Sequence, residues 1–307
     1  MDIFIFIVSM GALIYGADFI IEQSEKIALH FDISPFVIGA TLVALGTSLP
    51  EMAVSISASL QGSGDIAVAN VIGSTIFNIS LVLGAVFLMA KNINPSRDLF
   101  AKDSSWALFP ILIFILMSLD GKLNFVDGVL FLILMGAYLL FLVQSNQVEE
   151  LDIDEDEIKN RFNWPKTILF LAIGFVFVVG GADFAIDSAG NIARSFGISE
   201  WVIGLFLVAF GTSLPELVVS VKAALKNNAD LAIGAIIGSN VANFTMVLGL
   251  SSIVNPLNVD LSANFFDIAA AFIVTLMLVF ITANKLYNKS AGIALMVVLG
   301  LVIQNSL

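Results

Sequence analysis

Apolar runs long enough to cross a bilayer recur along this chain and constrain its fold more than any other feature. A helix of about 20 apolar residues spans a hydrocarbon core of ~30 Å. Such runs fall at 3–21, 36–60, 65–90, 105–119, 125–143, 165–186, 201–225, 230–254, 265–283 and 290–305. Only 12% of the residues are charged and 59% are hydrophobic, whereas about a quarter of a soluble protein is charged. We therefore predict an all-α integral membrane protein with ten transmembrane helices, which has the lipid bilayer as its surroundings.

Two stretches of the sequence repeat each other at an offset of 165 residues. Residues 36–51 read FVIGATLVALGTSLPE and residues 201–216 read WVIGLFLVAFGTSLPE, identical at 12 of 16 positions. The register holds without a gap from Gly16 to Gly84 of the first copy. Polar positions match as well as apolar ones, so a shared apolar composition does not explain the similarity. The chain is therefore predicted to consist of two homologous halves.

The predicted halves have opposite orientations in the membrane. They cover residues 1–143 and 165–307, and the acidic segment 144–164 links them. Each half contains five predicted spans, and an odd number inserts the second half upside down. Inverted repeats of this kind are typical of secondary transporters, whose binding sites lie at the repeat interface near the membrane midplane.

The distribution of basic residues provides an independent test of this topology. If the loops alternate across the membrane, one side carries Lys26, Lys91, Arg97, Lys102, Lys159, Arg161, Lys166, Lys222, Lys226, Lys285 and Lys289. The other side carries only Lys122 and Arg194. By the positive-inside rule, the linker is cytoplasmic. We expect a multi-pass protein of the plasma (inner) membrane with both termini on the extracellular or periplasmic side.

The motif GTSLPE places several oxygen atoms at one point of a span. Thr47 and Glu51 are four residues apart and share a helix face, and Ser48 lies beside them. Pro50 cannot donate a backbone hydrogen bond, so the helix should kink there and free carbonyl groups near Ala44 and Gly46. Carbonyl, hydroxyl and carboxylate oxygens together suit Ca²⁺ or Na⁺. The second copy offers the equivalent residues Ala209, Thr212, Ser213, Pro215 and Glu216.

The span after each motif adds further oxygen atoms. Ser74 and Asn78 are four residues apart, and so are Ser239 and Asn243. Both pairs follow a glycine, and small residues let helices approach closely. A single hydroxyl or amide of this kind is equally consistent with a hydrogen bond between helices.

The glutamates carry the stronger signal. A carboxylate in mid-span costs about 2.5–3.5 kcal/mol, so it indicates a functional site. No Lys or Arg within a span is placed to neutralise Glu51 or Glu216, so a bound cation is the expected counter-charge. Two ionised carboxylates match the charge of one Ca²⁺ or of two Na⁺, which predicts competition for a shared site and hence exchange.

The remaining acidic residues and the single histidine are expected to have structural roles. Asp18 and Asp183 repeat each other near the ends of spans, and a structural role is favoured for both. Asp65 and Asp230 are expected to cap the next span of each half. His30 is expected to be a surface residue of a loop.

The linker contains a spacing that resembles a Ca²⁺-binding loop. Asp152, Asp154 and Asp156 stand at positions 1, 3 and 5 of an EF-hand pattern. Position 6 is Glu157 and position 12 is Asn163, where the loop requires Gly and Glu. A solvated tether is therefore favoured over a regulatory Ca²⁺ site.

At the repeated motifs the sequence resembles the sodium/calcium exchanger family of cation/Ca²⁺ exchangers, in particular its prokaryotic members. The two GTSLPE segments and the segments Gly73–Asn78 and Gly238–Asn243 look like the α-repeats of that family. The resemblance implies a Ca²⁺ site made by Thr47, Glu51, Thr212, Glu216 and the carbonyl groups of Ala44 and Ala209. It also implies flanking Na⁺ sites that add Ser48, Ser74, Ser213 and Ser239, and a sliding gate formed by the first span of each half.

The resemblance also bears on the coupling ion. The proton-coupled branch of the superfamily typically carries Asn where Thr47 and Thr212 stand, which favours Na⁺ coupling here. Some members, including K⁺-dependent ones, carry Asp at the position of Asn243, so Asn in both copies weakens a K⁺-coupled interpretation.

Alternative functions remain open at this level. Buried glutamates bind protons readily, so a proton-coupled Ca²⁺ antiporter is the main alternative. A cation channel is another, and it would have to hold its ions weakly. An intramembrane hydrolase is disfavoured because the core offers no histidine and the chain has no cysteine, so no enzyme activity is expected. No resident cofactor and no obligate protein partner are indicated. The scattered basic residues give no support for nucleic-acid binding.

Overall fold

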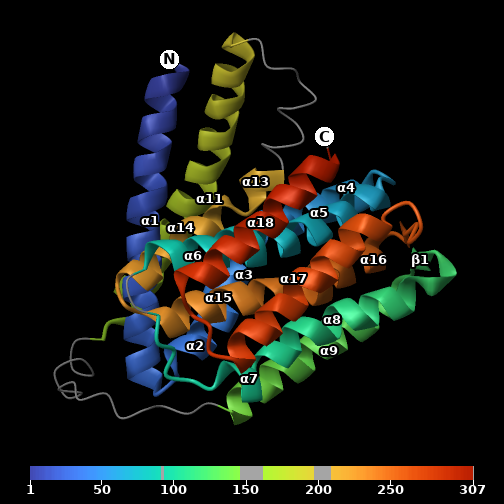
Figure 1. The fold of residues 1–307 in the computed structure, drawn as a ribbon. Helices are drawn as coiled ribbons and strands as arrows, with labels where there is room; N and C mark the ends of the chain where they lie inside the picture. The colour runs from blue at the N-terminus through green and yellow to red at the C-terminus, as the bar shows by residue number, and fades with distance from the viewer. Residues whose placement is uncertain (91–92, 146–161, 197–208, 307) are drawn as a thin grey trace.

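The computed structural model describes residues 1–90, 93–145, 162–196 and 209–306, which are almost entirely helical (Figure 1). Two features of the sequence lie outside the described residues. One is the EF-hand-like spacing at 152–163, of which only the last two residues are described. The other is the stretch 201–208, the first part of the second repeat copy.

The elements follow the predicted order of the two halves. The first half contains α1 (Asp2–Phe31), α2 (Pro35–Ile38), η1 (Gly39–Val43), α3 (Ala44–Thr47), α4 (Leu49–Leu60), α5 (Gly64–Phe77), η2 (Asn78–Leu83), α6 (Gly84–Met89), α7 (Leu99–Lys102), α8 (Ser104–Met117), η3 (Ser118–Asp120), β1 (Lys122–Leu123) and α9 (Phe125–Gln144). The second half contains α11 (Trp164–Ser195), α13 (Ala209–Thr212), α14 (Leu214–Leu225), α15 (Ala229–Ala242), η5 (Asn243–Val247), α16 (Leu248–Val254), β2 (Leu257–Asn258), α17 (Phe265–Ala283) and α18 (Lys289–Ser306).

Several of these helices can span a membrane. In the part of the chain that the structure describes, six are long and apolar enough, and a seventh candidate forms if the bent pair α2–α3 and α4 counts as one span. Two shorter apolar helices, Ser104–Asp120 and Lys289–Asn305, fall in two further predicted span ranges. The chain is a helical membrane protein, as the apolar runs predict.

Each GTSLPE motif breaks its helix at the serine. Ser48, with φ −84° and ψ 8°, separates α3 from α4, and the two parts are bent by 46°. Ser213 has nearly the same conformation, φ −87° and ψ 1°, between α13 and α14. The proline follows in the first turn of the new helix, where a missing N–H group leaves no intrahelical bond unmade. The predicted kink at Pro50 is confirmed.

Pro50 has no N–H group to donate to the Gly46 carbonyl oxygen four residues earlier, but the Ala44 carbonyl group is not released at this kink. The Ala44 carbonyl oxygen still accepts the Ser48 N–H at 3.0 Å. Because only one residue leaves the helical conformation, and it does so after this bond has closed, the last turn of α3 stays intact. The prediction that the break frees Ala44 was wrong.

Helices α1 and α11 lie side by side and stand at a steep angle to the rest of the bundle (Figure 1). Glycines allow their backbones to meet, since a Cβ atom on Gly16 would lie 2.8 Å from the Gly174 carbonyl oxygen. A Cβ atom on Gly181 would lie 3.0 Å from the Ser9 carbonyl oxygen. With the offset of 165, Gly16 corresponds to Gly181 and Ser9 to Gly174, so these are the same contact seen from each half.

A second pair of contacts repeats with a register that differs by one residue, since Gly84 corresponds to Gly249 but Gly128 corresponds to Ile293, the neighbour of Gly292. Helix α18 packs on α6, where a Cβ atom on Gly292 would lie 2.9 Å from the Gly84 carbonyl oxygen. Helix α9 packs on α16, where a Cβ atom on Gly128 would lie 2.6 Å from the Gly249 carbonyl oxygen. In each case the last helix of one half packs on the other half. The short strands β1 and β2 pair antiparallel and join the two halves at one end.

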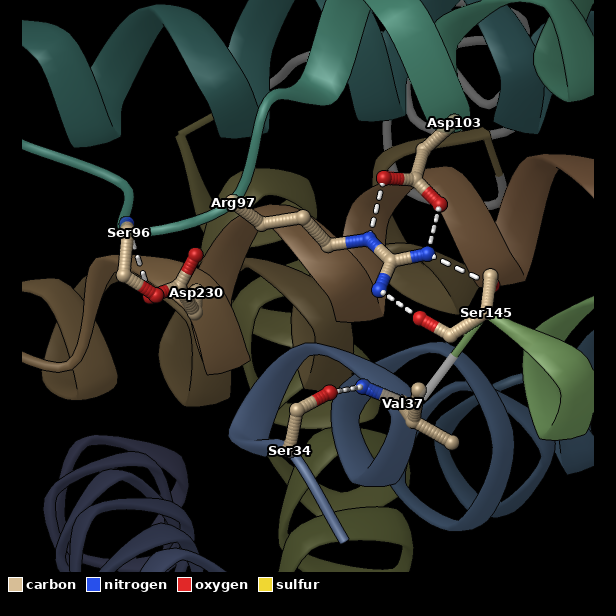
Figure 2. A network of polar contacts seen from close by, with 7 residues as sticks. All are labelled: Ser34, Val37, Ser96, Arg97, Asp103, Ser145 and Asp230. Carbon is tan, nitrogen blue, oxygen red and sulfur yellow. Dashed lines mark hydrogen bonds and ion pairs between the residues drawn. The ribbon is translucent and has the colours of Figure 1, made fainter. Parts of the chain in front are cut away.

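The side chain of the buried Arg97 contacts residues near α8, α9 and α2 (Figure 2). The Arg97 guanidinium donates to both carboxylate oxygens of Asp103, at 2.6 and 3.0 Å, and to the hydroxyl and carbonyl oxygens of Ser145, both at 2.8 Å. It also lies 5.0 Å from the centre of the Phe36 ring. Burial raises the pKa of the Asp103 carboxyl even though Arg97 lowers it, so desolvation dominates there.

The neighbouring Ser96 explains why one predicted helix cap was wrong. Asp230 accepts hydrogen bonds from the Ser96 N–H and hydroxyl groups, at 3.0 and 2.7 Å, instead of capping α15 (Figure 2). The cap is Asn228, whose side chain accepts from the Leu231 N–H. Asp65 lies in the first turn of α5 without capping it.

The two remaining structural predictions have mixed outcomes. Asp18 lies in the middle of α1 rather than near its end, and it forms ion pairs with Lys222 and Lys226 of α14 at 2.6 and 2.8 Å. It therefore has the structural role expected of it. His30 lies in the last turn of α1 rather than in a loop, and its ring stacks on Phe162 at 4.0 Å.

Candidate functional site

The site begins with the two glutamates, which occupy equivalent places in the fold. Glu51 lies in the first turn of α4 and Glu216 in the first turn of α14, directly after the two helix breaks. The exposed fraction of the side chain is 0% for Glu51 and 2% for Glu216. The positive end of a helix dipole favours a carboxylate at this position. The break therefore places each carboxyl group at the start of a new helix, whose dipole offsets part of the cost of burying it.

Hydrogen bonds satisfy only one oxygen atom of each carboxyl group. The Ser74 hydroxyl donates to Glu51 Oε1 at 3.5 Å, and the Ser48 hydroxyl donates to Glu216 Oε1 at 3.2 Å. The Oε2 atoms of both glutamates are buried without a hydrogen-bond partner. No Lys or Arg of the described residues forms an ion pair with either glutamate. A buried charge without a partner is costly, so this arrangement favours a cation.

The contacts cross between the two halves. Ser48 belongs to the first half and its partner Glu216 to the second, while the Ser239 hydroxyl donates to the Ala44 carbonyl oxygen at 3.4 Å. The two glutamates are also close enough to interact electrostatically. Helix α3 packs on α15 and helix α13 packs on α5, so each broken helix meets the polar span of the other half. The structure thus places Ser48 and Ala44 of the first half in contact with Glu216 and Ser239 of the second.

Several of the predicted residues have polar atoms that no protein group satisfies. The hydroxyl groups of Thr212 and Ser213 are buried without a partner, and so are both polar atoms of the Asn243 side chain. Thr47 differs, because its hydroxyl donates to the carbonyl oxygens of Val43 and Ala44 at 3.1 and 3.3 Å. Unsatisfied buried polar atoms are rare in native proteins, and a ligand is one of the accepted explanations.

The two predicted asparagines begin widened helical turns. Asn78 is the first residue of the π-helical segment η2 and Asn243 the first of η5, and neither side chain is exposed. Single π-helical turns inside α-helices are frequent at functional sites. Ala209 is the first residue of α13, and the segment 201–208 before it lies outside the described residues.

Two further polar residues at the site were not predicted. The Asn70 amide donates to the Glu51 carbonyl oxygen at 3.2 Å and to the Ser55 hydroxyl at 2.9 Å. The Asn240 side chain accepts from the Asn78 amide at 3.3 Å. Neither asparagine recurs in the other half, where Ala235 and Thr75 stand at the equivalent positions, so the repeat did not identify them. The signal that could have found them is a polar side chain in a span otherwise built of small and apolar residues.

The chemistry available at the site is that of hard oxygen ligands. The described residues contain no group of three or more His, Cys, Asp and Glu side chains that could hold a metal ion. The site therefore combines two carboxylates with neutral hydroxyl, amide and carbonyl oxygens. Such a set suits Ca²⁺ and Na⁺ better than a transition metal.

Comparison with known proteins identifies close similarities over the whole chain. The model of the sodium/calcium exchanger protein family matches residues 1–144 and 166–306. The chain is 38% identical to an uncharacterized membrane protein of Methanocaldococcus jannaschii, over 94% of this chain and 92% of that protein. It is 31% identical to the sodium/calcium exchanger MaX1 of Methanosarcina acetivorans, over 95% of this chain and 94% of that protein. Among solved structures, the sodium-calcium exchanger NCX_Mj soaked with Na⁺ and Sr²⁺ matches with a TM-score of 0.84 and 34% identity, over 99% of this chain and 97% of that one.

Proposed function

The chain belongs to the sodium/calcium exchanger family of cation antiporters, and from this premise we propose that it exchanges Na⁺ for Ca²⁺ at one shared site between its two halves. The observation that carries the proposal is the pair of buried glutamates, each with one carboxylate oxygen that no protein group satisfies. One Ca²⁺ or two Na⁺ supply the missing positive charge. Since both glutamates are needed for Ca²⁺, the two kinds of ion compete.

We propose the site residues as predicted from the sequence. The Ca²⁺ ligands come from Thr47, Glu51, Thr212, Glu216, Ala44 and Ala209, and the flanking Na⁺ ligands add Ser48, Ser213, Ser74 and Ser239. Asn78 and Asn243 are further ligands of the shared metal site. The contacts between Ser48 and Glu216 and between Ser239 and Ala44 support this set, because they join the two halves around the carboxyl groups.

The proposed architecture is a pair of inverted five-helix halves, residues 1–143 and 165–307, with a cytoplasmic linker at 144–164 and both termini outside. The repeated glycine contacts between α1 and α11 support a two-fold relation between the halves. Alternating access to the site would then use movement of α1 and α11 against the rest of the bundle. The location is proposed to be the plasma (inner) membrane.

Substitution of the glutamates tests the site. Glu51→Gln and Glu216→Gln are each expected to abolish Na⁺-driven Ca²⁺ uptake into proteoliposomes, because the neutral amide removes half of the negative charge. Glu22→Gln is the matched control, since Glu22 lies on an exposed face of α1 and pairs with Lys26. All three variants should elute as folded protein in size-exclusion chromatography. Uptake at the wild-type rate in either site variant contradicts the proposal.

The coupling ion requires a separate measurement. Ca²⁺ uptake is expected when the vesicles contain Na⁺ and the outside does not, and it is expected to be absent with a pH gradient alone. Two buried carboxylates close to one another also hold protons well, and this observation supports proton coupling as the alternative. Uptake driven by the pH gradient in the absence of Na⁺ would establish the alternative. Ca²⁺ flux without any counter-ion would indicate a channel.

A further inference from the structure

The two equivalent asparagines of the site have different surroundings. The Asn78 Nδ2 group donates to Asn240 Oδ1 at 3.3 Å, and both side chains are buried. With the offset of 165, the equivalent pair is Asn243 and Thr75. No hydrogen bond joins that pair in the described structure, because the Thr75 hydroxyl and both polar atoms of Asn243 lack a partner. The hydrogen bond therefore exists in only one of the two half-sites.

A second difference lies in the same half-site. The Asn70 amide donates to the backbone carbonyl oxygen of Glu51 and to the Ser55 hydroxyl. The residue equivalent to Asn70 is Ala235, which has no polar side chain, and the hydroxyl of Ser220, equivalent to Ser55, is buried without a partner. The Asn70 and Asn240 side chains thus form hydrogen bonds around Glu51 and Asn78. Neither set of hydrogen bonds has a counterpart around Glu216 and Asn243.

The direction of the Asn78–Asn240 bond determines which atom of Asn78 remains available. An asparagine amide has one carbonyl oxygen and one NH₂ group, and only the oxygen binds a cation. Because the NH₂ group of Asn78 donates a hydrogen bond to Asn240, the Asn78 amide is held in one orientation. Its Oδ1 atom is then buried without a hydrogen-bond partner.

We propose that Asn240 is a positioning residue, which orients the Asn78 carbonyl oxygen toward the cation and makes the half-site of Glu51 more rigid than that of Glu216. This inference rests on the proposed function. Asn240 itself is not a ligand, because its Oδ1 atom accepts from Asn78 and its remaining polar group is a donor. A ligand already held in its binding orientation loses less conformational freedom when the ion arrives. The Glu51 side of the shared site therefore holds its ligands in place before the cation arrives, whereas Asn243 on the Glu216 side is free to adjust to ions of different size.

Calorimetric titration of the purified protein with Ca²⁺ in the absence of Na⁺ tests the role of Asn240. Asn240→Leu removes the acceptor for the Asn78 amide and is expected to raise the Kd for Ca²⁺ about tenfold. Asn240→Asp retains an acceptor at that place and is expected to bind Ca²⁺ at least as tightly as the wild type. Thr75→Val is the matched control, since it changes the equivalent residue of the other half, whose hydroxyl has no partner, and it should leave the Kd within about twofold.

The outcomes separate positioning from folding. A purely structural role of Asn240 would lower the melting temperature of Asn240→Leu and leave the Kd of the folded protein unchanged. That result overturns the inference, and so does an Asn240→Asp variant that binds as weakly as Asn240→Leu. If the wild type binds Ca²⁺ but Na⁺ does not drive its uptake, the proposed coupling fails while the titration still tests Asn240. If the wild type transports normally and Asn240→Leu binds like Thr75→Val, only the role of Asn240 fails.

Discussion

At the scale of single residues, the site differs from an ordinary polar cluster in the number of atoms left without a protein partner. Structural serines and threonines in these helices donate to the carbonyl group four residues earlier, as Ser80, Thr245 and Thr275 do. The hydroxyl of Thr212, which lies near the Glu51 carboxyl group, makes no such bond. Unlike the structural hydroxyl groups, the Thr212 hydroxyl therefore does not donate its hydrogen bond to a carbonyl group of its own helix.

Thr212→Val is expected to separate ion binding from stability. The substitution keeps the shape of the side chain and removes a hydroxyl that no protein group uses, so the melting temperature without ions should change little. Loss of one oxygen that contacts a charged ligand should weaken Ca²⁺ binding about tenfold or more. Calorimetric titration and a thermal unfolding scan measure the two effects. A lowered melting temperature with an unchanged Kd would show that Thr212 is structural.

At the scale of elements, the ion pairs between α1 and α14 exist in only one half of the molecule. Asp18 of α1 pairs with Lys222 and Lys226, and Lys222 also donates to the Ile14 carbonyl oxygen at 3.2 Å. The repeat places Asp183 in α11, but Ser57 and Gln61 stand where the lysines would be. Among the described residues, α1 thus forms ion pairs with its neighbour, and no equivalent ion pair joins α11 to α4.

Asp18→Asn is expected to loosen α1 at this point. Exposed ion pairs contribute only ~0.2–1 kcal/mol each, so local opening should increase by a few-fold rather than unfold the protein. Hydrogen exchange followed by mass spectrometry should show faster exchange in the middle of α1 and at the end of α14. Asp183→Asn is the control and should leave the exchange of α11 unchanged. Equal effects of the two substitutions would contradict a one-sided fastening.

The network around Arg97 predicts a large and pH-dependent effect on stability. Arg97 and Asp103 are nearly fully buried, with side-chain exposures of 5% and 0%, and breaking such a pair costs about 3–5 kcal/mol. Without the guanidinium, the pKa of Asp103 in the folded protein rises further above its unfolded value. The stability of Arg97→Ala is then greatest below the unfolded pKa and falls as the pH rises.

The melting temperature measures this effect directly. The melting temperature of Arg97→Ala should lie further below that of the wild type at about pH 7 than at about pH 4. Arg97→Lys keeps the charge but not the two-pronged contact with the carboxylate, so its melting temperature should be intermediate. If the difference in melting temperature between Arg97→Ala and the wild type does not change with pH, the loss of stability does not come from a buried Asp103 carboxylate that has lost its positive partner.

At the scale of the whole molecule, the inverted arrangement of the halves can be tested with equivalent residues. Gln61 and Lys226 are separated by 165 positions and both follow the helix that begins at a GTSLPE break. The chain has no cysteine, so a single introduced cysteine is the only thiol. In intact cells, a membrane-impermeant thiol reagent is expected to label Gln61→Cys from outside and to leave Lys226→Cys unlabelled until the cells are opened. Labelling of both from the same side would contradict inverted halves.

The sequence by itself determined the helical membrane class of the fold and singled out the two glutamates of the proposed site. Apolar runs of span length require helices, because only a helix satisfies its backbone inside a bilayer without other segments. The break at GTSLPE is equally local, since Pro50 and Pro215 act on their own turn of helix. The two glutamates were identified because the cost of burying a carboxylate does not depend on knowing its neighbours.

Only the tertiary structure decided which polar atoms meet. Asn240 and Asn78 are far apart in the sequence, as are Asp18 and Lys222, and nothing in their local pattern pairs them. Asp230 has the sequence position of a helix cap, yet it binds Ser96, because the loop that carries Ser96 folds over the start of α15. Local propensity acts over a few residues, whereas these contacts depend on the packing of whole helices. The sequence could therefore specify each half-site, and only the assembled bundle reveals that the two half-sites are unequal.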